Sequence, residues 1–506
     1  MTTPTAVTQP TWYGHIRDMF STPDRQCMAA QGLDLASYET VMNHAGNIYQ
    51  QVAAGNMPMG RPWAPDWVAT FLNWMNAGYP KGVPASGALE FSARTLLTAN
   101  VPASRLRKDI TTLSDQELAL LKHAFATIMA MDPSEPNSFF VQAGYHWFPA
   151  PNTYCMHHVP GYNPWHRAYL VSFENALRAV PGCENVTLPY WDLTAPFPEV
   201  LKSTPFDHYT LPHAVGPDYP QGYTTTRFPY EQIAQNLLDN DVTGDINRAM
   251  GKTDWEDFHG WWSGAAHNTI ISAHDGGHNS IGTTMQAQEV AAFDPVFWFF
   301  HCNWDRLFWE WQKSMRATDL HGLLTTINEV SDSFSYQLFN DPALQALNPF
   351  TRNPPELDTL GVINSVTQLD VDYGPPAAAA RVAFTVKTSR TLAASKAFTV
   401  AADRVNVRVS GINRLKIPGT FSVHLQKDGK TLATRALFQP VEVQTCANCV
   451  SNAMTQFDFE LPLADVLGGP LSVWVEPANK DVIGERVPLK LMGDPVIEVH
   501  LLLQTE

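Results

Sequence analysis

The spacing of hydrophobic residues changes near residue 374, from a period typical of helices to one typical of strands. Before that point, apolar residues recur at helical spacing from Asp115 to Phe125 and again after Pro164. A third helix is predicted over roughly 295–311, with a proline in its first turn, where the missing backbone N–H costs little. The first part of the chain is therefore expected to be mainly α-helical.

Beyond residue 374, apolar and polar residues alternate with a period of two. The alternation runs from Phe421 to Leu425, and Lys427–Lys430 supplies a hairpin turn through its Asp-Gly pair. It returns at 473–475 and again at 496–503. A Gly-Pro-Pro turn and four alanines after Tyr373 form a spacer. We expect two domains: residues 1–374, mainly α, and residues 375–506, an all-β sandwich-like domain.

Composition excludes several classes of partner. With 33 basic and 49 acidic residues, the formal net charge is -16, which repels the phosphate backbone of nucleic acids. We find no basic start followed by an apolar run, and no apolar stretch of membrane-spanning length. Six cysteines in 506 residues are too few for a disulfide framework, which favours a reducing compartment. We expect a cytoplasmic protein without nucleic-acid or membrane partners, either monomeric or homo-oligomeric.

The sharpest chemical signal is a histidine pair, His274-Asp-Gly-Gly-His278. Two imidazoles four residues apart lie on one face of a helix and can converge on one ion. A zinc protease needs Glu directly after the first histidine, and this chain has Asp275 followed by two helix-weakening glycines. His301 stands in an otherwise apolar helix, where a lone histidine is also common as a core residue. The pair alone therefore indicates a metal site without identifying it.

Two segments together identify the site. The first reads Cys-Met-His157, then Pro-Trp-His166-Arg nine residues on, then Leu-Pro-Tyr-Trp-Asp192. The second reads His274-x3-His278, then Phe-Asp-Pro-Val-Phe-Trp before a further histidine and Asn-Trp-Asp-Arg-Leu. They closely resemble the two copper-binding halves of the type 3 copper family, which comprises tyrosinases, catechol oxidases and haemocyanins. The resemblance covers residues 120–374 and is closest to bacterial or fungal tyrosinases with a C-terminal β-rich domain.

The resemblance implies a four-helix bundle that holds two copper ions and uses dioxygen as co-substrate. Six imidazoles without a thiolate suit copper that cycles between Cu(I) and Cu(II). His158 is the rival of His157, but the nine-residue step to the next ligand favours His157. The implied ligands are His146, His157 and His166 for one copper, and His274, His278 and His301 for the other.

The implied activity is that of a tyrosinase, which oxidises small monophenols to catechols and catechols to ortho-quinones. Many hydroxylating relatives carry an acidic residue one turn before the first ligand of the second copper, and an Asn just after that ligand. Here those places hold Ile271 and Asp275, and Asn279 follows the next ligand. Asp275 and Asn279 are therefore the candidate catalytic residues. The alternatives are a catechol oxidase or ortho-aminophenol oxidase without monophenol hydroxylation, and a haemocyanin-like oxygen carrier.

Two cysteine features have roles in the resembled family. Cys155 lies two residues before His157, where fungal and molluscan relatives form a thioether to the histidine ring, so we expect this crosslink. Cys446-Ala-Asn-Cys449 resembles the motif that hands Cu(I) to the active site in fungal tyrosinases. Soft thiolates suit Cu(I), although an inert or redox pair is the alternative for Cys446 and Cys449.

The β-rich tail of related proenzymes covers the copper cleft and inserts a side chain into it. Phe438 is the candidate for such a plug, and Phe457 and Phe459 are its rivals. All three are also expected as ordinary residues of a sandwich core.

Overall fold

The computed structural model divides into two compact units. One comprises residues 1–101 with 312–345, and the other 102–311 with 346–506. The histidine-rich region and the β-rich tail thus belong to the same unit, and the domain division at residue 374 stays a prediction. The structure describes residues 6–20, 28, 33–35, 37–57, 63–81, 105–148, 154–260, 269–327, 333–342, 344–351, 357–377, 403–441, 453–480, 484, 487 and 492–502.

The smaller unit is helical and has an aromatic core. The rings of Trp12 and Trp74 lie 6.0 Å apart, Phe71 packs 5.5 Å from Trp74, and all three are fully buried. Ser37 caps α2, and Pro65 stands at the start of α3, where it needs no N–H partner. Its elements are η1 (Trp12–Ile16), η2 (Arg17–Met19), α2 (Tyr38–Ala53), α3 (Pro65–Asn76), α13 (Leu320–Thr325) and α14 (Ser333–Asn340).

The larger unit contains the three helices predicted from hydrophobic spacing, and all three are confirmed. They are α5 (Asp115–Ala130), α7 (Tyr162–Arg178) and α12 (Val296–Met315), the last beginning directly after Pro295. The other helices are η3 (Ile110–Thr112), α6 (Phe139–Gly144), η4 (Glu199–Lys202), α8 (Tyr230–Asp239), α9 (Val242–Met250), α10 (Trp255–His259), α11 (Ile270–Ile281), η5 (Ala291–Phe293) and α15 (Ser365–Leu369).

The C-terminal part forms two three-stranded antiparallel sheets, in the orders β6-β3-β8 and β5-β4-β7. One hydrophobic cluster contains buried residues from both sheets, among them Val407 of β3 and Val423 of β4. The predicted hairpin joins β4 to β5, with Asp428 and Gly429 at positive φ. The elements are β3 (Arg404–Asn413), η6 (Arg414–Lys416), β4 (Phe421–Lys427), β5 (Lys430–Leu437), β6 (Met454–Pro462), α17 (Leu463–Val466), β7 (Leu471–Pro477) and β8 (Gly493–Leu502).

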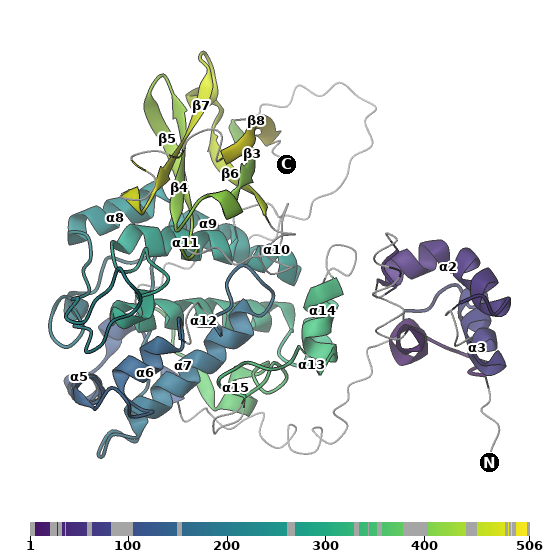
Figure 1. Cartoon of the computed structure of the whole chain (residues 1–506), viewed down its shortest axis with the longest axis horizontal. Coiled ribbons are helices and arrows are strands. Elements are labelled where there is room, and N and C mark those ends of the chain that lie inside the picture. Colours follow the sequence, from purple (N-terminus) through teal and green to yellow (C-terminus); the bar gives the residue numbers. More distant parts are fainter. Residues whose placement is uncertain are drawn as a thin grey trace. The chain divides into compact units, whose positions relative to one another are not determined.

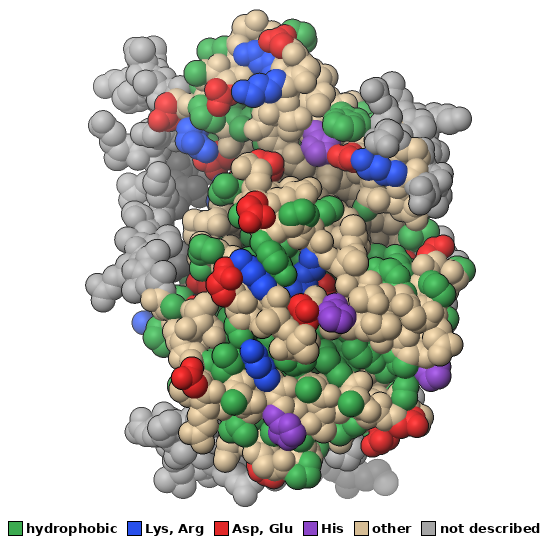
Figure 2. Space-filling view, turned by 90° about the vertical axis from the view of Figure 1, so that its left-hand side faces the viewer, with side chains coloured by type: hydrophobic (Ala, Val, Ile, Leu, Met, Phe, Trp, Pro, Cys, Tyr) green, Lys and Arg blue, Asp and Glu red, His purple; other side chains and the backbone are tan. Residues whose placement is uncertain are grey.

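The sheets lie over α8, α9 and α11, and β5 packs against α11 (Figure 1). Arg435 of β5 is buried there and pairs with Asp241 at 3.3 Å and with Asp245 at 3.6 Å. On the face drawn in Figure 2, the described basic and acidic side chains lie interspersed with hydrophobic ones. Among the described residues, no helix is long and apolar enough to cross a membrane.

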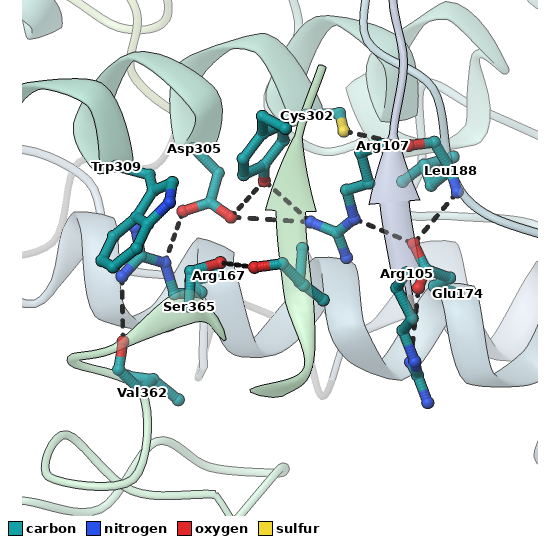
Figure 3. A network of polar contacts seen from close by, with 12 residues as sticks. Arg105, Arg107, Arg167, Glu174, Leu188, Cys302, Asp305, Trp309, Val362 and Ser365 are labelled. Atoms are coloured by element: carbon teal, nitrogen blue, oxygen red, sulfur yellow. Dashed lines mark hydrogen bonds and ion pairs between the residues drawn. The ribbon is translucent and has the colours of Figure 1, made fainter. Parts of the chain in front are cut away.

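A buried polar network fixes α7 against α12 (Figure 3). Arg167 of α7 donates to Asp305 of α12 at 2.6 Å, and the Tyr373 hydroxyl donates to the other oxygen of Asp305 at 2.5 Å. Arg107 donates to Glu174 of α7 at 2.8 Å. Arg107 and Tyr373 belong to a two-stranded parallel sheet, β1 (Arg105–Arg107) with β2 (Val371–Tyr373). Charges this deeply buried are stable only when paired, so the network sets the relative position of two helices that carry histidines.

Candidate metal centre

The structure brings the six predicted histidines together in two groups of three. His166 lies on α7, His274 and His278 on α11, and His301 on α12. His146 follows the end of α6, and His157 lies in the loop before α7. In each group the candidate ligand atoms lie within 4.8 Å of one another, and Cys155 belongs to the first group.

The two groups adjoin. The rings of His166 and His301 are stacked, with centroids 4.7 Å apart and planes at 8°. The rings of His157 and His274, again one from each group, lie 5.5 Å apart. Two ions held by these groups would therefore be neighbours, as a shared bridging ligand requires.

Close packing of α11 against α12 explains Gly277, the second of the two glycines between His274 and His278. A Cβ added at Gly277 would lie 2.6 Å from the ring of Phe300 on α12. Any larger residue would push the two helices apart. The Nε2 atoms of His278 on α11 and His301 on α12 approach to 3.3 Å. Gly277 weakens the helix, but it lets α11 and α12 pack closely enough for His278 and His301 to meet.

The histidine rings are oriented by hydrogen bonds at Nδ1. His166 bonds to the carbonyl of Tyr162 at 2.9 Å, and His278 bonds to the carbonyl of Met285 at 2.8 Å. Within the described part of the chain, the Nε2 atoms of His146 and His274 are buried and have no hydrogen-bond partner. A metal ligated through Nε2 would satisfy both atoms, so the residues present fit a metal.

Burial keeps all six imidazoles neutral, which a metal ligand requires. Burial lowers the pKa of His146 to about 3, despite the opposing hydrogen bond from its ring to the Gln288 carbonyl. Burial likewise lowers the pKa of the other five well below the usual value, and neighbouring imidazoles lower it further in each. An all-imidazole donor set without a charged ligand fits copper.

Cys155 lies against His157. Its Sγ is 3.2 Å from Nδ1 and 3.8 Å from Nε2 of that ring. Burial raises the pKa of the Cys155 thiol well above its usual value. The geometry is compatible with the expected thioether, which stays a prediction.

Asp275 orients a histidine and also contacts the tail. One oxygen bonds to Nδ1 of His274 at 2.8 Å. The other accepts from the backbone N–H of Phe438 at 3.0 Å and lies 3.3 Å from Nε2 of His158. Burial raises the pKa of Asp275. Both oxygens are therefore engaged when the tail is in place.

Phe438 lies on the histidines, whereas its two rivals do not. Its fully buried ring stacks on His278, with centroids 4.0 Å apart and planes at 12°, and lies 5.3 Å from the ring of His157. Phe457 and Phe459 belong to the hydrophobic cluster between the sheets. The sequence analysis chose Phe438 as the candidate and kept the other two as rivals, because all three occur in β-patterned segments.

Asn279 and His158 both contact the tail. The Asn279 amide donates to Ser422 of β4 at 2.9 Å, and its oxygen accepts from Gln286 at 2.8 Å. Nε2 of His158 lies 3.0 Å from the carbonyl oxygen of Phe438. A catalytic role for Asn279 stays a prediction.

Other polar residues of the two motifs serve the packing of helices. Asp305 belongs to the network with Arg167, and Asn303 accepts hydrogen bonds from Arg306. Asp192 accepts a hydrogen bond from the backbone N–H of Thr194, and its other oxygen lies 3.7 Å from Arg306. Cys183 and Cys302 are buried thiols, as expected, whereas Cys27, Cys446 and Cys449 lie outside the described residues.

Sequence reasoning missed the loop between α11 and α12. The carbonyls of Met285 and Gln288 bond to His278 and His146, and the Gln288 amide bonds to His157. Two of these contacts use main-chain oxygen, which every residue type offers. The sequence holds no signal that would have found them.

Known proteins resemble this chain over the region that holds the six histidines. The family model described as the common central domain of tyrosinase matches residues 136–314. The tyrosinase of Aspergillus oryzae is 25% identical over 481 residues, which covers 69% of this chain and 87% of that protein.

Solved structures share the fold. A tyrosinase from Burkholderia thailandensis matches with a TM-score of 0.56 and 22% identity, over 78% of this chain and 99% of that one. A functional unit of octopus haemocyanin matches with a TM-score of 0.56 and 18% identity, over 79% of this chain and 100% of that one. The chain therefore has a tyrosinase-like fold, a helical domain with a C-terminal sheet region.

Proposed function

We propose that this chain, which belongs to the type 3 copper protein family, is a tyrosinase that oxidises monophenols to catechols and catechols to ortho-quinones with dioxygen. The observation that carries the proposal is the pair of adjoining three-histidine groups, in which the buried Nε2 atoms of His146 and His274 have no hydrogen-bond partner among the described residues. Three ligands per ion leave a coordination position open for another molecule. Two bound copper ions would supply the redox chemistry.

The protein's part is to hold ligands and exclude water. We propose that α6, α7, α11 and α12 act as the four-helix bundle that holds the coppers, and that the two sheets act as a sandwich. The α7–α12 network sets the helix positions, and the Nδ1 partners set the rings. A buried, preorganised ligand set needs little reorganisation when the metals bind or react.

We propose that the tail holds the enzyme in a closed state. The Phe438 ring lies on His278, where an aromatic substrate would have to approach the second copper. The Phe438 main chain is held on both sides, by Asp275 and His158. Substrate access then requires the loop after β5 to move away.

The hydroxylation step needs a group that accepts the phenol proton, and we propose Asp275 for this role in the open state. Departure of Phe438 would remove its N–H from one Asp275 oxygen, which then keeps only the contact to His158, and burial already raises the pKa of this carboxyl, which makes it a better base. The other oxygen would continue to orient His274. Asp275→Asn keeps an acceptor for His274 but loses the base, so it should lower monophenol turnover more than catechol turnover. Equal losses on both substrates would contradict the role.

We also propose the Cys155–His157 thioether and copper delivery by Cys446 and Cys449. The 3.2 Å approach of Sγ to the ring supports the thioether. Intact-protein mass after copper loading should be lower by two hydrogens than that of the metal-free chain. A Cys446→Ser, Cys449→Ser double variant should load copper more slowly, and normal loading would contradict delivery.

An oxygen carrier is the second candidate. The matched haemocyanin unit and the ring of Phe438 over the site favour it, because a carrier must keep substrates out. Catechol oxidase and ortho-aminophenol oxidase remain alternatives within the enzyme class.

Oxygen uptake separates these functions. Copper-loaded full-length protein and a Phe438→Ala variant would be given a monophenol and then its matching catechol. Uptake with both substrates supports a tyrosinase, and uptake with catechol alone indicates a catechol oxidase. Reversible oxygen binding with no uptake in either protein would indicate a carrier and refute the proposal.

A further inference from the structure

A single buried glutamine in the loop after α11 contacts two of the six histidines. Gln288 is 1% exposed. Its carbonyl oxygen lies 3.0 Å from Nδ1 of His146, and its side-chain amide lies 3.0 Å from Nδ1 of His157. We propose that Gln288 is a positioning residue of the first copper site, which fixes the ring of His157 through its side chain. The inference rests on the proposed function only in requiring that the site binds copper.

The hydrogen-bonding state of the Gln288 amide points to this role. As placed, Nε2 faces His157, while Oε1 is buried and has no hydrogen-bond partner among the described residues. The two ends of an amide have nearly the same shape, so their assignment follows from the hydrogen bonds. Turning the amide by half a rotation places Oε1 at Nδ1 of His157 and moves the NH2 group to the position where Oε1 has no partner. The oxygen then accepts the Nδ1 proton that an imidazole ligating through Nε2 must carry.

His157 depends on such a partner more than the four histidines that lie on helices. His166, His274, His278 and His301 lie on helices, which fix the direction in which each side chain leaves the backbone. His157 lies in a non-helical loop and is half-buried. Its ring is placed by Gln288 on one side and Cys155 on the other.

The same contact determines which edge of the ring faces the thiol. Sγ of Cys155 lies 3.2 Å from Nδ1 and 3.8 Å from Nε2 of His157, and Cε1 is the carbon bonded to both of these nitrogens. A thioether at this carbon removes one hydrogen from sulfur and one from carbon. They leave as two protons with two electrons, which reduce one dioxygen to hydrogen peroxide. A ring released by Gln288 would turn this carbon away from sulfur, so Gln288 should be needed for the crosslink as well as for the metal.

The loop also joins the two half-sites. Met285, three residues earlier, accepts a hydrogen bond from His278 of the second group. One short loop therefore orients ligands of both coppers, and only the contact to His157 uses a side chain. That contact alone can be removed by substitution while the main-chain contacts remain.

Four variants test the proposal. Gln288→Leu removes the amide, and Gln288→Asn keeps a polar group but withdraws it by one methylene. Gln288→Glu keeps an acceptor oxygen at full length. Gln286→Leu is the matched control, because Gln286 lies in the same loop and bonds to Asn279 rather than to a histidine. Circular dichroism would show that each variant is folded.

Each protein is loaded with copper and dialysed against a competing chelator, and copper per chain is measured together with the crosslinked fraction by peptide mass. Loss of a partner that orients a metal-bound histidine typically weakens metal binding about 10- to 100-fold. We expect Gln288→Leu and Gln288→Asn to lose one of two coppers at chelator concentrations that leave the wild type loaded, and to be largely uncrosslinked. Gln288→Glu and Gln286→Leu should match the wild type.

Wild-type copper retention and crosslinking in Gln288→Leu and Gln288→Asn would overturn the proposal. Loss in Gln288→Glu equal to that in Gln288→Leu would overturn the acceptor role. Oxygen uptake with catechol is measured in parallel for the wild type and for Phe438→Ala. If both hold two coppers and neither oxidises the catechol, the proposed function is refuted and the Gln288 result stays decisive. A wild type that takes up no copper would overturn both.

Discussion

Replacing Phe438 by Ala removes the ring that covers the second group of histidines. The ring is 0% exposed, and its two main-chain hydrogen bonds do not involve the side chain. The substitution therefore takes away the packing of the ring on His278, His157 and His274 and leaves the main-chain contacts of the tail in place.

The size of the effect follows from the buried ring. Full burial of a phenylalanine side chain contributes about 2–3 kcal/mol relative to an exposed one. In the variant, the free energy that stabilises the closed state relative to the open state falls by this amount. At 1.36 kcal/mol per tenfold change, the open-to-closed ratio rises about 30- to 150-fold. If the closed state dominates in the wild type, kcat/KM for a catechol should rise by a comparable factor.

The assay is oxygen uptake at low catechol concentration, with copper content measured in each sample. Phe71→Ala is the matched control, because Phe71 is equally buried but lies in the smaller unit. It should lower the melting temperature without raising kcat/KM. A folded, copper-loaded Phe438→Ala variant within twofold of wild-type kcat/KM would refute the plug.

Three further predictions concern docking, pH and helix packing. Arg435→Ala leaves Asp241 and Asp245 without their partner from the tail, which should weaken docking of the tail by about 3 kcal/mol and raise both activity and proteolytic cleavage of the tail. Arg404→Ala removes a more exposed ion pair within the tail and should change neither activity nor cleavage. A hydrogen bond from His424, with one from Lys480, lowers the pKa of Glu476 from 4.5 to about 2, so this carboxylate stabilises the fold above pH 4.5 and loses that effect as pH falls through about 2. Calorimetry should show a lower melting temperature for Glu476→Gln at pH 7, with a difference that narrows below pH 4.5; a constant difference would contradict this. Gly277→Ala forces a Cβ to within 2.6 Å of Phe300 and should lower the unfolding free energy by about 1–3 kcal/mol. Gly46→Ala, on α2 with open space around it, should raise the unfolding free energy by about 0.5–1 kcal/mol. Equal shifts in the melting temperatures of the two variants would contradict the packing argument.

Local features were well predicted from the sequence. The period of the hydrophobic residues predicted α5, α7 and α12, and the Asp-Gly pair predicted the β4–β5 hairpin. Such elements can be predicted because they depend on residues that are close together in the sequence. The six histidines were found because helical spacing and two motifs place them in order. The structure then brought them into two groups.

Contacts between residues far apart in the sequence could not be predicted from it. Phe438 and Asp275 meet across 163 positions, and the Gln288 amide reaches His157 across 131. Both pairs form only once the tail and the α11–α12 loop are folded onto the helices. The reason for Gly277 likewise appears only with Phe300 beside it.

The central claim is a copper pair held by six imidazoles, and X-ray absorption with metal analysis of the copper-loaded chain tests it most directly. The account predicts two coppers per chain, about 3.5–4 Å apart, each with three imidazole nitrogen ligands and no sulfur ligand. A single copper per chain, or two coppers with sulfur among their ligands and no copper neighbour, would contradict it.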